Sequence, residues 1–584
     1  MAEVVPEVVS MLIHEPGNIM ILRRIAPYRT ATALLASLIS AMGTALAQPP
    51  AGAVAPATVG PGSVETTPTA TPIKHLVVIY DENISFDHYF ATYPKAANPP
   101  GEPPFTAEQD TPWVSNLATA RLLTNNPNLA NPANGAGAAN PFRLDRTQAA
   151  TADQNHAYTP EQLAYDHGKA DLFPKYTGMG DFGGKGVLGT SGLVMGYYDG
   201  NTVTAVWNYA QHFAMSDNAH GNTYGPSTPG ALEVVAGQTN GEQFVVGTKA
   251  KATKPGIAYV DNGIGGLTMI QDLDPGYDLC STRQDQVVME GDNIGELLNA
   301  AGITWGGFMG GFNLETTNAN GTTGCARSTY SAVMKRAIPD YIPHHNWFQY
   351  YALTANPTHA RPVSLVNVGY SFAHDGTRDP ANHEYDLQDF YDAVRAGDFP
   401  AVSFIKLPAY QDGHAGYSNP LDEQTGIVSL VNFVEQQLDW KDTAIIITYD
   451  DSDGWYDHGF SAPTNPSYDK VADQLDGPGK CGFGTPLPGI SGKPVNGRCG
   501  LGPRLPFLVV SPWAKSNYVS HAQIDQASVI RFIEDNWLSG ERLGEGSFDA
   551  TSGSIMDMFD FTSTGGKTPA VRLDPATGEV VSRQ

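Results

Sequence analysis

Four oxygen-bearing side chains stand in two adjacent pairs, Glu82-Asn83 and Asp450-Asp451, and each pair follows a short apolar run. Carboxylate and amide oxygens are the ligands that Mg²⁺, Ca²⁺ and Mn²⁺ prefer, and zinc also accepts carboxylates. Either pair alone is more simply explained as helix caps or turn residues. The two pairs together favour a site for a divalent metal ion whose identity the residues leave open.

Ser227 stands in the segment Gly225-Pro226-Ser227-Thr228-Pro229, in which Pro229 suits the first turn of a helix beginning near Thr228. Backbone N–H groups and the dipole at a helix N-terminus favour anions. A serine in that position, beside a divalent cation, can attack phosphorus. Taken alone, the segment is more simply a Ser/Thr helix cap.

Several of the 15 histidines lie in polar, loop-like segments: His156, the pair His344-His345, His414 and His458. Each of them singly fits a surface or hydrogen-bonded histidine. Several histidines that converge on one phosphate could bind its oxygens and protonate a leaving group. Sequence spacing does not show whether they converge.

The segments that would position these groups alternate between strand and helix patterns. Apolar runs predict strands at 75–80, 303–309, 363–369, 401–405, 443–449 and 505–511. Helical faces are predicted at Ile427, Leu430, Val431, Val434 and Leu438, and at Val529, Ile530, Ile533 and Trp537. The alternation predicts an α/β fold, a three-layer α/β/α sandwich with a mostly parallel central sheet and loop-rich insertions. Ligands gather at the carboxyl ends of such strands, where both oxygen pairs would stand.

The charge balance restricts the partners of the chain. Its 584 residues include 34 basic and 60 acidic side chains, which gives a net charge of −26. This excess argues against binding to nucleic acid and against electrostatic docking on anionic membranes. It does not exclude an anionic substrate, because a metal ion sets its own local field.

The N-terminal region predicts export. Arginines at 23, 24 and 29 precede an apolar stretch, and Ala45-Leu46-Ala47 fits a cleavage site, so residues 1–47 are predicted to be a signal peptide. Met20 is an alternative start, and a twin-arginine signal is a weaker alternative because the residues after the arginines match poorly. The short apolar stretch disfavours a retained anchor, so we expect no stable membrane span and a periplasmic or secreted protein.

The rest of the chain divides into a linker and one large domain. Residues 48–72 are rich in Ala, Pro, Gly and Thr and predict a disordered linker, which leaves 73–584 as a single catalytic domain with insertions. Four cysteines fit an oxidising compartment and allow three disulfide connectivities. We favour 280–325 and 481–499, because each pair flanks a variable-looking loop region.

Residues 82–90, Glu-Asn-Ile-Ser-Phe-Asp-His-Tyr-Phe, resemble the Glu-Asn-Arg-Ser-Phe-Asp-His-Tyr-Phe signature of the bacterial phospholipase C/acid phosphatase phosphoesterase family, in the alkaline-phosphatase-like superfamily. Later segments follow in the family's order: Asp153-x-x-His156, Gly225-Pro226-Ser227-Thr228-Pro229, His345, Asp412-Gly413-His414 and Tyr449-Asp450-Asp451 through His458. The resemblance spans about residues 74–540 and implies an alkaline-phosphatase-like fold. By position it implies metal ligands at Glu82, Asn83, Asp450 and Asp451, a nucleophile at Ser227, and phosphate binding or proton transfer by His156, His345 and His414. His344 competes with His345 for its role.

Three departures from the family pattern bear on the substrate. Ser227 replaces the Thr usual in the phospholipases, Gly230 replaces Asn, and Asp451 replaces Glu, and these variants favour the acid phosphatase branch. We therefore expect an exported acid phosphatase that hydrolyses phosphate monoesters with a serine nucleophile and a bound divalent metal. The alternative is a phospholipase C that cleaves phosphocholine-type phosphodiesters of phospholipid head groups. A third reading is a catalytically silent binding protein that keeps the fold.

Overall fold

The structure is a computed structural model that describes residues 67–178, 190–245, 258–282, 285–373, 375–562 and 569–583. The predicted signal peptide and most of the predicted linker lie outside these residues. The prediction of one catalytic domain over 73–584 stays a prediction. Within the described ranges, no helix is both long enough and apolar enough to cross a membrane.

The central sheet has eight described strands in the order β14-β11-β15-β1-β16-β17-β4-β18. Their bounds are β14 Glu384–Asp386, β11 Trp305–Met309, β15 Val402–Lys406, β1 His75–Asp81, β16 Thr443–Tyr449, β17 Phe507–Val510, β4 Ala214–Ser216 and β18 Tyr518–Ser520. Only β17 runs antiparallel to its neighbours in this sheet, and every other pairing is parallel. The predicted mostly parallel sheet is confirmed.

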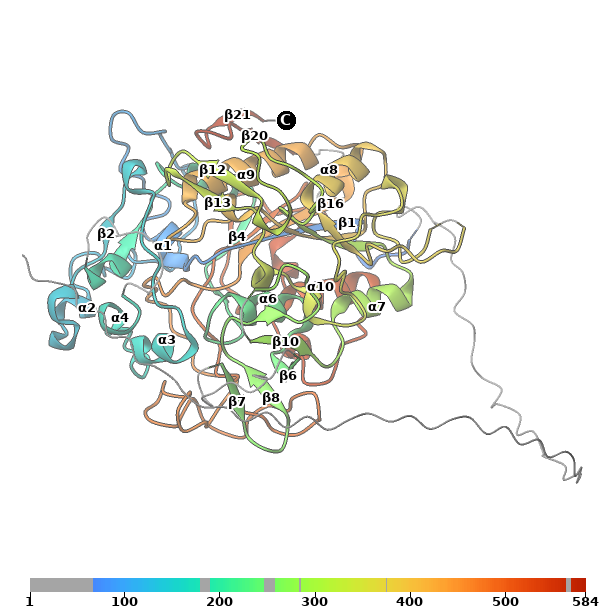
Figure 1. Ribbon diagram of the computed structural model, residues 1–584. Coiled ribbons are helices and arrows are strands. Elements are labelled where there is room, and N and C mark those ends of the chain that lie inside the picture. Colours follow the sequence, from blue (N-terminus) through green and yellow to red (C-terminus); the bar gives the residue numbers. More distant parts are fainter. Residues whose placement is uncertain are drawn as a thin grey trace, which may run out of the picture. The chain divides into compact units, whose positions relative to one another are not determined.

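Helices cover both faces of this sheet, so side chains of β1 are buried whichever way they point. Leu76 and Val78 belong to a core shared with α6 (Ser227–Ala236), α7 (Ile294–Ala301) and α10 (Ser528–Trp537). Val77 and Ile79 belong to a core shared with α5 (Thr204–His212), α8 (Leu387–Arg395) and α9 (Pro420–Val434). Figure 1 shows α8 and α9 on one side of the sheet and α6, α7 and α10 on the other. This is the expected three-layer α/β/α arrangement, and it explains why the strands read as continuous apolar runs.

The remaining elements are short and joined by long loops. A second sheet has the order β7-β8-β6-β10-β9, with bounds β7 Tyr259–Asp261, β8 Leu267–Met269, β6 Asn240–Phe244, β10 Gln286–Met289 and β9 Asp274–Pro275. Two-stranded pairs are β2 Phe142–Arg143 with β3 Gly196–Tyr197, β5 Ala219–His220 with β19 Ile524–Asp525, β12 Ser328–Ser331 with β13 Arg336–Pro339, and β20 Val571–Leu573 with β21 Val580–Arg583. The other helices are α1 Phe86–Phe90, α2 Pro127–Ala130, α3 Tyr158–Tyr165 and α4 Phe173–Tyr176. Disulfides join Cys280 to Cys325 and Cys481 to Cys499, which confirms the favoured connectivity.

Two of the predicted elements are wrong. Residues 363–369 form a turn around the 3-10 helix Leu365–Asn367, with Val366 67% exposed and Val368 buried, so an apolar run alone misled the strand prediction. The sheet edge is occupied instead by β14, whose three residues are too few to show a strand pattern. Leu438 does not continue the buried face of α9, because it begins a 3-10 helix and is 92% exposed.

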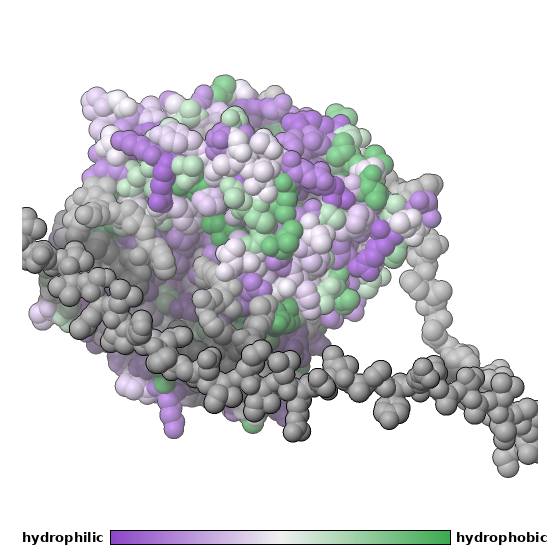
Figure 2. Space-filling model, viewed as in Figure 1, coloured by the Kyte–Doolittle hydropathy of each residue, from purple (hydrophilic) through white to green (hydrophobic). Residues whose placement is uncertain are grey.

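The visible surface carries both hydrophilic and apolar side chains. Figure 2 shows one face on which hydrophilic side chains predominate and apolar side chains lie in separate groups among them. The acidic and polar residues that matter for the site are not on this surface. They lie buried at the carboxyl ends of the central strands.

Candidate active site

The two oxygen pairs emerge beside each other because β1 and β16 are parallel neighbours. Asp81 pairs with Tyr449 in the sheet register, so Glu82 and Asp450 are the next residue on each strand. Asn83 has φ +57°, a left-handed conformation that asparagine tolerates, and its N–H donates to Asp450 Oδ1 at 3.3 Å. All four predicted ligands are buried.

Ser227 is the first residue of α6, the position expected from the sequence to within one residue. Its Oγ lies 3.0 Å from Glu82 Oε2 and 3.2 Å from Asp451 Oδ2. The helix can come this close because residue 230 is glycine: a Cβ there would stand 2.1 Å from the backbone oxygen of Asp450. The fold therefore brings the predicted nucleophile into contact with both predicted ligand pairs.

These residues fit a divalent cation. Asn83 Oδ1 and Asp450 Oδ2 are buried, and neither has a hydrogen-bond partner among the described residues. Burial raises the pKa of Glu82 to about 7 and also raises the pKa of Asp450 and Asp451. Crowded, desolvated carboxylates with unused oxygens are stabilised by a hard cation, which would take these oxygens as ligands.

His156 is held by one ring nitrogen and directs the other into the site. Its Nδ1 lies 2.8 Å from the Gln154 carbonyl oxygen and 3.3 Å from Asp453 Oδ1, and its Nε2 lies 3.4 Å from Asn83 Nδ2. Burial alone would lower the pKa of His156, but Asp451, Asp453 and Asp153 raise it well above its ordinary value. Asp153, His156, His414 and Asp453 are close enough to hold a metal ion. An Nδ1 that faces a carbonyl is better explained as an N–H donor, so we interpret the two aspartates as supports for a charged imidazole.

The other two predicted histidines also reach the site. His345 Nδ1 lies 3.0 Å from Glu82 Oε1, whereas His344 Nδ1 lies 3.7 Å from Asp274, so His345 is the one beside the ligand pairs. The ring of His414 lies 5.7 Å from that of His156 and 6.4 Å from that of His345. Burial lowers the pKa of His414 to about 4, and its Nδ1 contacts the Ala415 carbonyl at 2.5 Å. A neutral ring with Nδ1–H bound in this way leaves Nε2 as a proton acceptor.

A buried lysine that sequence reasoning missed stands among these groups. Lys406 is the last residue of β15, and its side chain is 1% exposed. Its ammonium contacts Glu82 Oε1 and lies 3.7 Å from Asp450 Oδ2. Burial alone would lower the pKa of Lys406, but Glu82, Asp450 and Asp412 raise it above its ordinary value. The rule applied to the two oxygen pairs, that residues at the carboxyl ends of parallel strands face the ligand, would have found it.

Glu161 of α3, also missed, joins the two loops that carry the chemistry. One of its carboxylate oxygens accepts from the Ser452 hydroxyl at 2.5 Å, and the other accepts from the Gly225 N–H at 2.9 Å. Ser452 follows the predicted ligand Asp451, and Gly225 lies two residues before the predicted nucleophile Ser227. The carboxylate thereby holds both loops at a fixed separation. No sequence signal distinguishes Glu161 from a surface helix residue.

The family model described as "Phosphoesterase family" matches residues 73–538, which is most of the chain. The chain belongs to the phosphoesterase family. The family predicted from the sequence motifs is thereby confirmed.

Relatives of this phosphoesterase include two named bacterial proteins. "Non-hemolytic phospholipase C" of Burkholderia pseudomallei is 24% identical over 518 residues, with 86% of this chain and 61% of that protein covered. "Phospholipase C A" of Mycobacterium tuberculosis is 23% identical over 481 residues, with 79% of this chain and 72% of that protein covered. This chain thus spans less than two thirds of the first relative. A solved phosphonate monoester hydrolase of Agrobacterium radiobacter is 10% identical, covers 64% of this chain and 77% of its own, and has a TM-score of 0.28, too low to support an argument.

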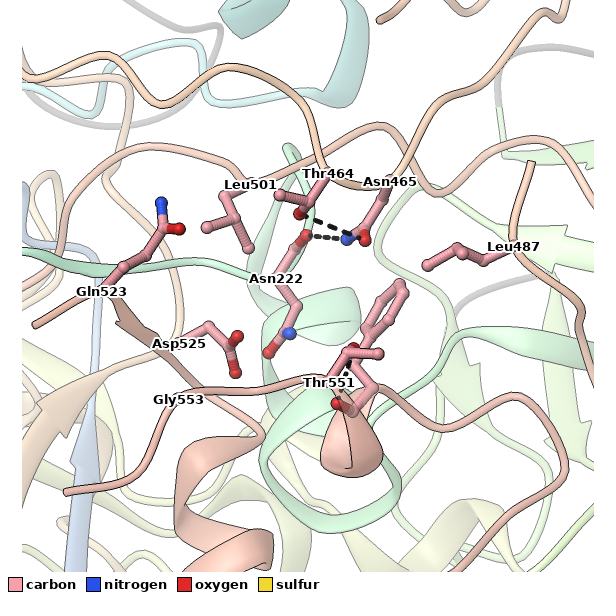
Figure 3. Close-up of a pocket in the computed structure, with 10 residues that line it drawn as sticks. Asn222, Thr464, Asn465, Leu487, Leu501, Gln523, Asp525, Thr551 and Gly553 are labelled. Carbon is pink, nitrogen blue, oxygen red and sulfur yellow. Dashed lines mark hydrogen bonds between the residues drawn. The ribbon is translucent and has the colours of Figure 1, made fainter. Parts of the chain in front are cut away.

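A separate cavity of about 260 Å³ lies behind the nucleophile loop of the phosphoesterase (Figure 3). Neither Ser227 nor any predicted metal ligand lines it. Asp525 points its carboxylate into it toward Asn222 (Figure 3), and the neighbouring Gln526 accepts the Asn222 N–H at 3.1 Å. Gln526 in turn donates to the Asp450 carbonyl at 2.5 Å. Gln526, which follows the lining residue Asp525, therefore links Asn222 of the cavity to the end of β16.

Proposed function

We propose that this chain is an exported, metal-dependent hydrolase of phosphoric esters that uses Ser227 as its nucleophile. The supporting observation is the contact of Ser227 Oγ with Glu82 at 3.0 Å and Asp451 at 3.2 Å. Glu82, Asn83, Asp450 and Asp451 would hold the divalent cation. When bound, such a cation polarises the phosphate and favours the alkoxide form of a nearby hydroxyl. The two disulfides fit the periplasmic or secreted location.

The histidines divide the proton transfers of this reaction. The Ser227 hydroxyl passes its proton to the carboxylate oxygen of Glu82 or Asp451 to which it donates, Oγ attacks phosphorus, the bond to the leaving oxygen breaks, and a phosphoseryl group forms on the enzyme. His156, charged because of its aspartates, gives a proton to the leaving oxygen from Nε2. His414, neutral because of its burial, takes a proton from the water that then cleaves the phosphoseryl bond. His345, on Glu82, orients that carboxylate and the phosphate oxygens.

Two substrate classes remain as candidates, and the relatives favour the phospholipase C alternative over the acid phosphatase reading. We therefore place cleavage of phospholipid-type phosphodiesters first. Phosphate monoesters stay the second candidate, because Ser227, Gly230 and Asp451 depart from the pattern usual in phospholipases. The structure explains why glycine stands at position 230. A Cβ there would meet the Asp450 carbonyl, so an Asn would force α6 away from β16.

A paired assay tests this proposal. The purified chain from residue 48 is assayed on p-nitrophenyl phosphocholine and p-nitrophenyl phosphate across pH, with metal and with chelator. We expect metal-dependent turnover of at least one substrate, with the phosphocholine ester preferred. Ser227→Ala should lower kcat roughly 10⁴-fold or more, while loss of its hydrogen bonds should lower the free energy of unfolding by about 1 kcal/mol.

Each outcome has a distinct meaning. Turnover of the monoester alone would restore the acid phosphatase reading. Inactivity on both substrates with metal supplied would favour the silent binding protein. Near-normal turnover by folded Ser227→Ala would remove Ser227 from the nucleophile role.

A further inference from the structure

The candidate metal centre contains a positive charge of its own. Two residues beside the Lys406 ammonium, Glu82 and Asp450, belong to the set predicted to hold the divalent cation. The position of Lys406 is fixed at both ends. The Lys406 carbonyl accepts the Gly310 N–H at 3.0 Å, and its ammonium lies 5.8 Å from the centre of the Tyr80 ring. No solvated conformation is available to a side chain that is 1% exposed.

Glu82 connects this lysine to the nucleophile. Its Oε1 contacts Lys406 and lies 3.0 Å from His345 Nδ1, while its Oε2 lies 3.0 Å from Ser227 Oγ. Because Lys406 and His345 both lie at Oε1, Oε2 is the oxygen left for Ser227 and the cation.

We propose that Lys406 is a permanent cation of this metal centre: it is a positioning residue that turns Glu82 Oε2 toward Ser227, and it weakens the hold of the carboxylates on the divalent ion. The inference rests on the proposed function, because it concerns the same centre. Because Lys406 weakens metal binding, the metal ion exchanges with ions in solution and is not permanently retained.

The ammonium of Lys406 repels a metal ion that binds the same carboxylates. Like charges repel with an energy that varies inversely with distance and effective dielectric, and salt screens buried charges little. An ammonium within contact distance of Glu82 and 3.7 Å from Asp450 therefore opposes the entry of a second cation at the same carboxylates. A merely structural ion pair has the opposite consequence. If Lys406 only positioned Glu82 and its charge did not act on the metal, removing the lysine would misplace Glu82 and metal binding would become weaker.

Metal binding measured directly separates the two roles. Wild type, Lys406→Met, Lys406→Gln and Lys406→Arg are stripped with chelator and titrated with MnCl₂, with free Mn²⁺ followed by electron paramagnetic resonance. Lys470→Gln, a change at an exposed lysine, gives the same change in net charge away from the site. Near-ultraviolet circular dichroism checks that each variant is folded, and Lys406→Gln serves if the Met variant is not.

The neutral variants should bind Mn²⁺ roughly ten-fold more tightly than wild type, because one unit charge is removed a few ångströms away. Lys406→Arg and Lys470→Gln should stay close to the wild-type affinity. kcat on the better p-nitrophenyl substrate should fall in both neutral variants even with metal saturating, because Glu82 is no longer held toward Ser227. Weaker or unchanged Mn²⁺ binding by a folded neutral variant would overturn the inference while leaving the proposed function in place. A wild type that binds no Mn²⁺ and turns over neither ester would overturn both.

Discussion

The two ring nitrogens of His156 meet different surroundings, and this difference assigns the residue its chemistry. Nδ1 faces the Gln154 carbonyl and the carboxylate of Asp453, while Nε2 faces Asn83 in the site. The aspartates hold the proton on the ring, whereas the more deeply buried His414, with a pKa lowered to about 4, is neutral at working pH. We therefore propose His156 as the acid and His414 as the base of this site, because their neighbours shift their pKa values in opposite directions.

His156→Asn should slow the hydrolysis of esters with poor leaving groups most, because their leaving oxygen must be protonated as its bond to phosphorus breaks. For an alkyl phosphoester we expect kcat to fall roughly 10²–10⁴-fold, and less for a p-nitrophenyl ester of the same class. The alkaline fall of wild-type kcat should lie above pH 6.5, since the pKa is raised, and should disappear in the variant. Equal losses on both esters would mean that His156 binds phosphate and transfers no proton.

The raised pKa of His156 should also make the stability of the fold depend on pH. A histidine whose folded pKa is raised stabilises the folded state fully below its unfolded pKa, near 6.5, and this contribution is lost as pH rises through the folded value. Thermal melts of wild type and His156→Asn should therefore differ most at low pH and converge at high pH.

At the scale of elements, the close contact between α6 and the end of β16 sets the geometry of the site. The helix carries Ser227, the strand delivers Asp450 and Asp451, and Gly230 is the point where they touch. No side chain separates the two backbones there. Any atom added at this contact must move the nucleophile relative to the metal ligands.

Gly230→Ala should therefore damage catalysis as well as stability. Its Cβ would stand 2.1 Å from the Asp450 carbonyl, a backbone atom that cannot rotate away, and we expect a loss of about 1–3 kcal/mol in the free energy of unfolding. Gly295→Ala on α7 is the matched control, because its Cβ would meet the Trp305 ring at 2.3 Å, on a helix that carries no site residue. Both variants should have a lower melting temperature than wild type, but only Gly230→Ala should have a lower kcat per folded molecule. Unchanged kcat in Gly230→Ala would show that Ser227 tolerates movement of its helix.

At the scale of the whole molecule, the parallel sheet gathers side chains from distant parts of the chain. Glu82, Lys406 and Asp450 follow or end three adjacent strands, β1, β15 and β16. Their carboxylates are desolvated and crowded, so the folded state carries an electrostatic cost that only cations offset. Metal binding should therefore contribute to the stability of the entire domain.

Removing the metal should lower the melting temperature of the wild type, because a ligand that binds only the folded state stabilises it by mass action. At a metal concentration of about 100 times Kd, this amounts to about 2.7 kcal/mol. Asp450→Asn should bind metal more weakly and lose turnover, and its melting temperature should respond less to added metal. An unchanged wild-type melting temperature after verified metal removal would contradict a stabilising cation in this centre. Full activity of that metal-free protein would rule out the metal mechanism.

The sequence determined those features that depend on local pattern. The short Val/Ile-rich run at 75–80 predicted a buried strand, and α10 followed from the spacing of Val529, Ile530 and Ile533. The segment 363–369 is the exception, because a similar apolar composition there forms a 3-10 turn that exposes Val366 and buries Val368.

The family motifs likewise named Glu82, Asn83, Ser227, Asp450 and Asp451 as one site, because motif order is a property of the chain alone. The tertiary structure decided what those residues contact. Only packing placed His345, and not His344, on Glu82, set two aspartates behind His156, and brought Glu161 into the site from another element. Contacts between side chains far apart in the sequence depend on sheet order, register and helix approach. These arise from the packing of the whole core, so no local pattern encodes them.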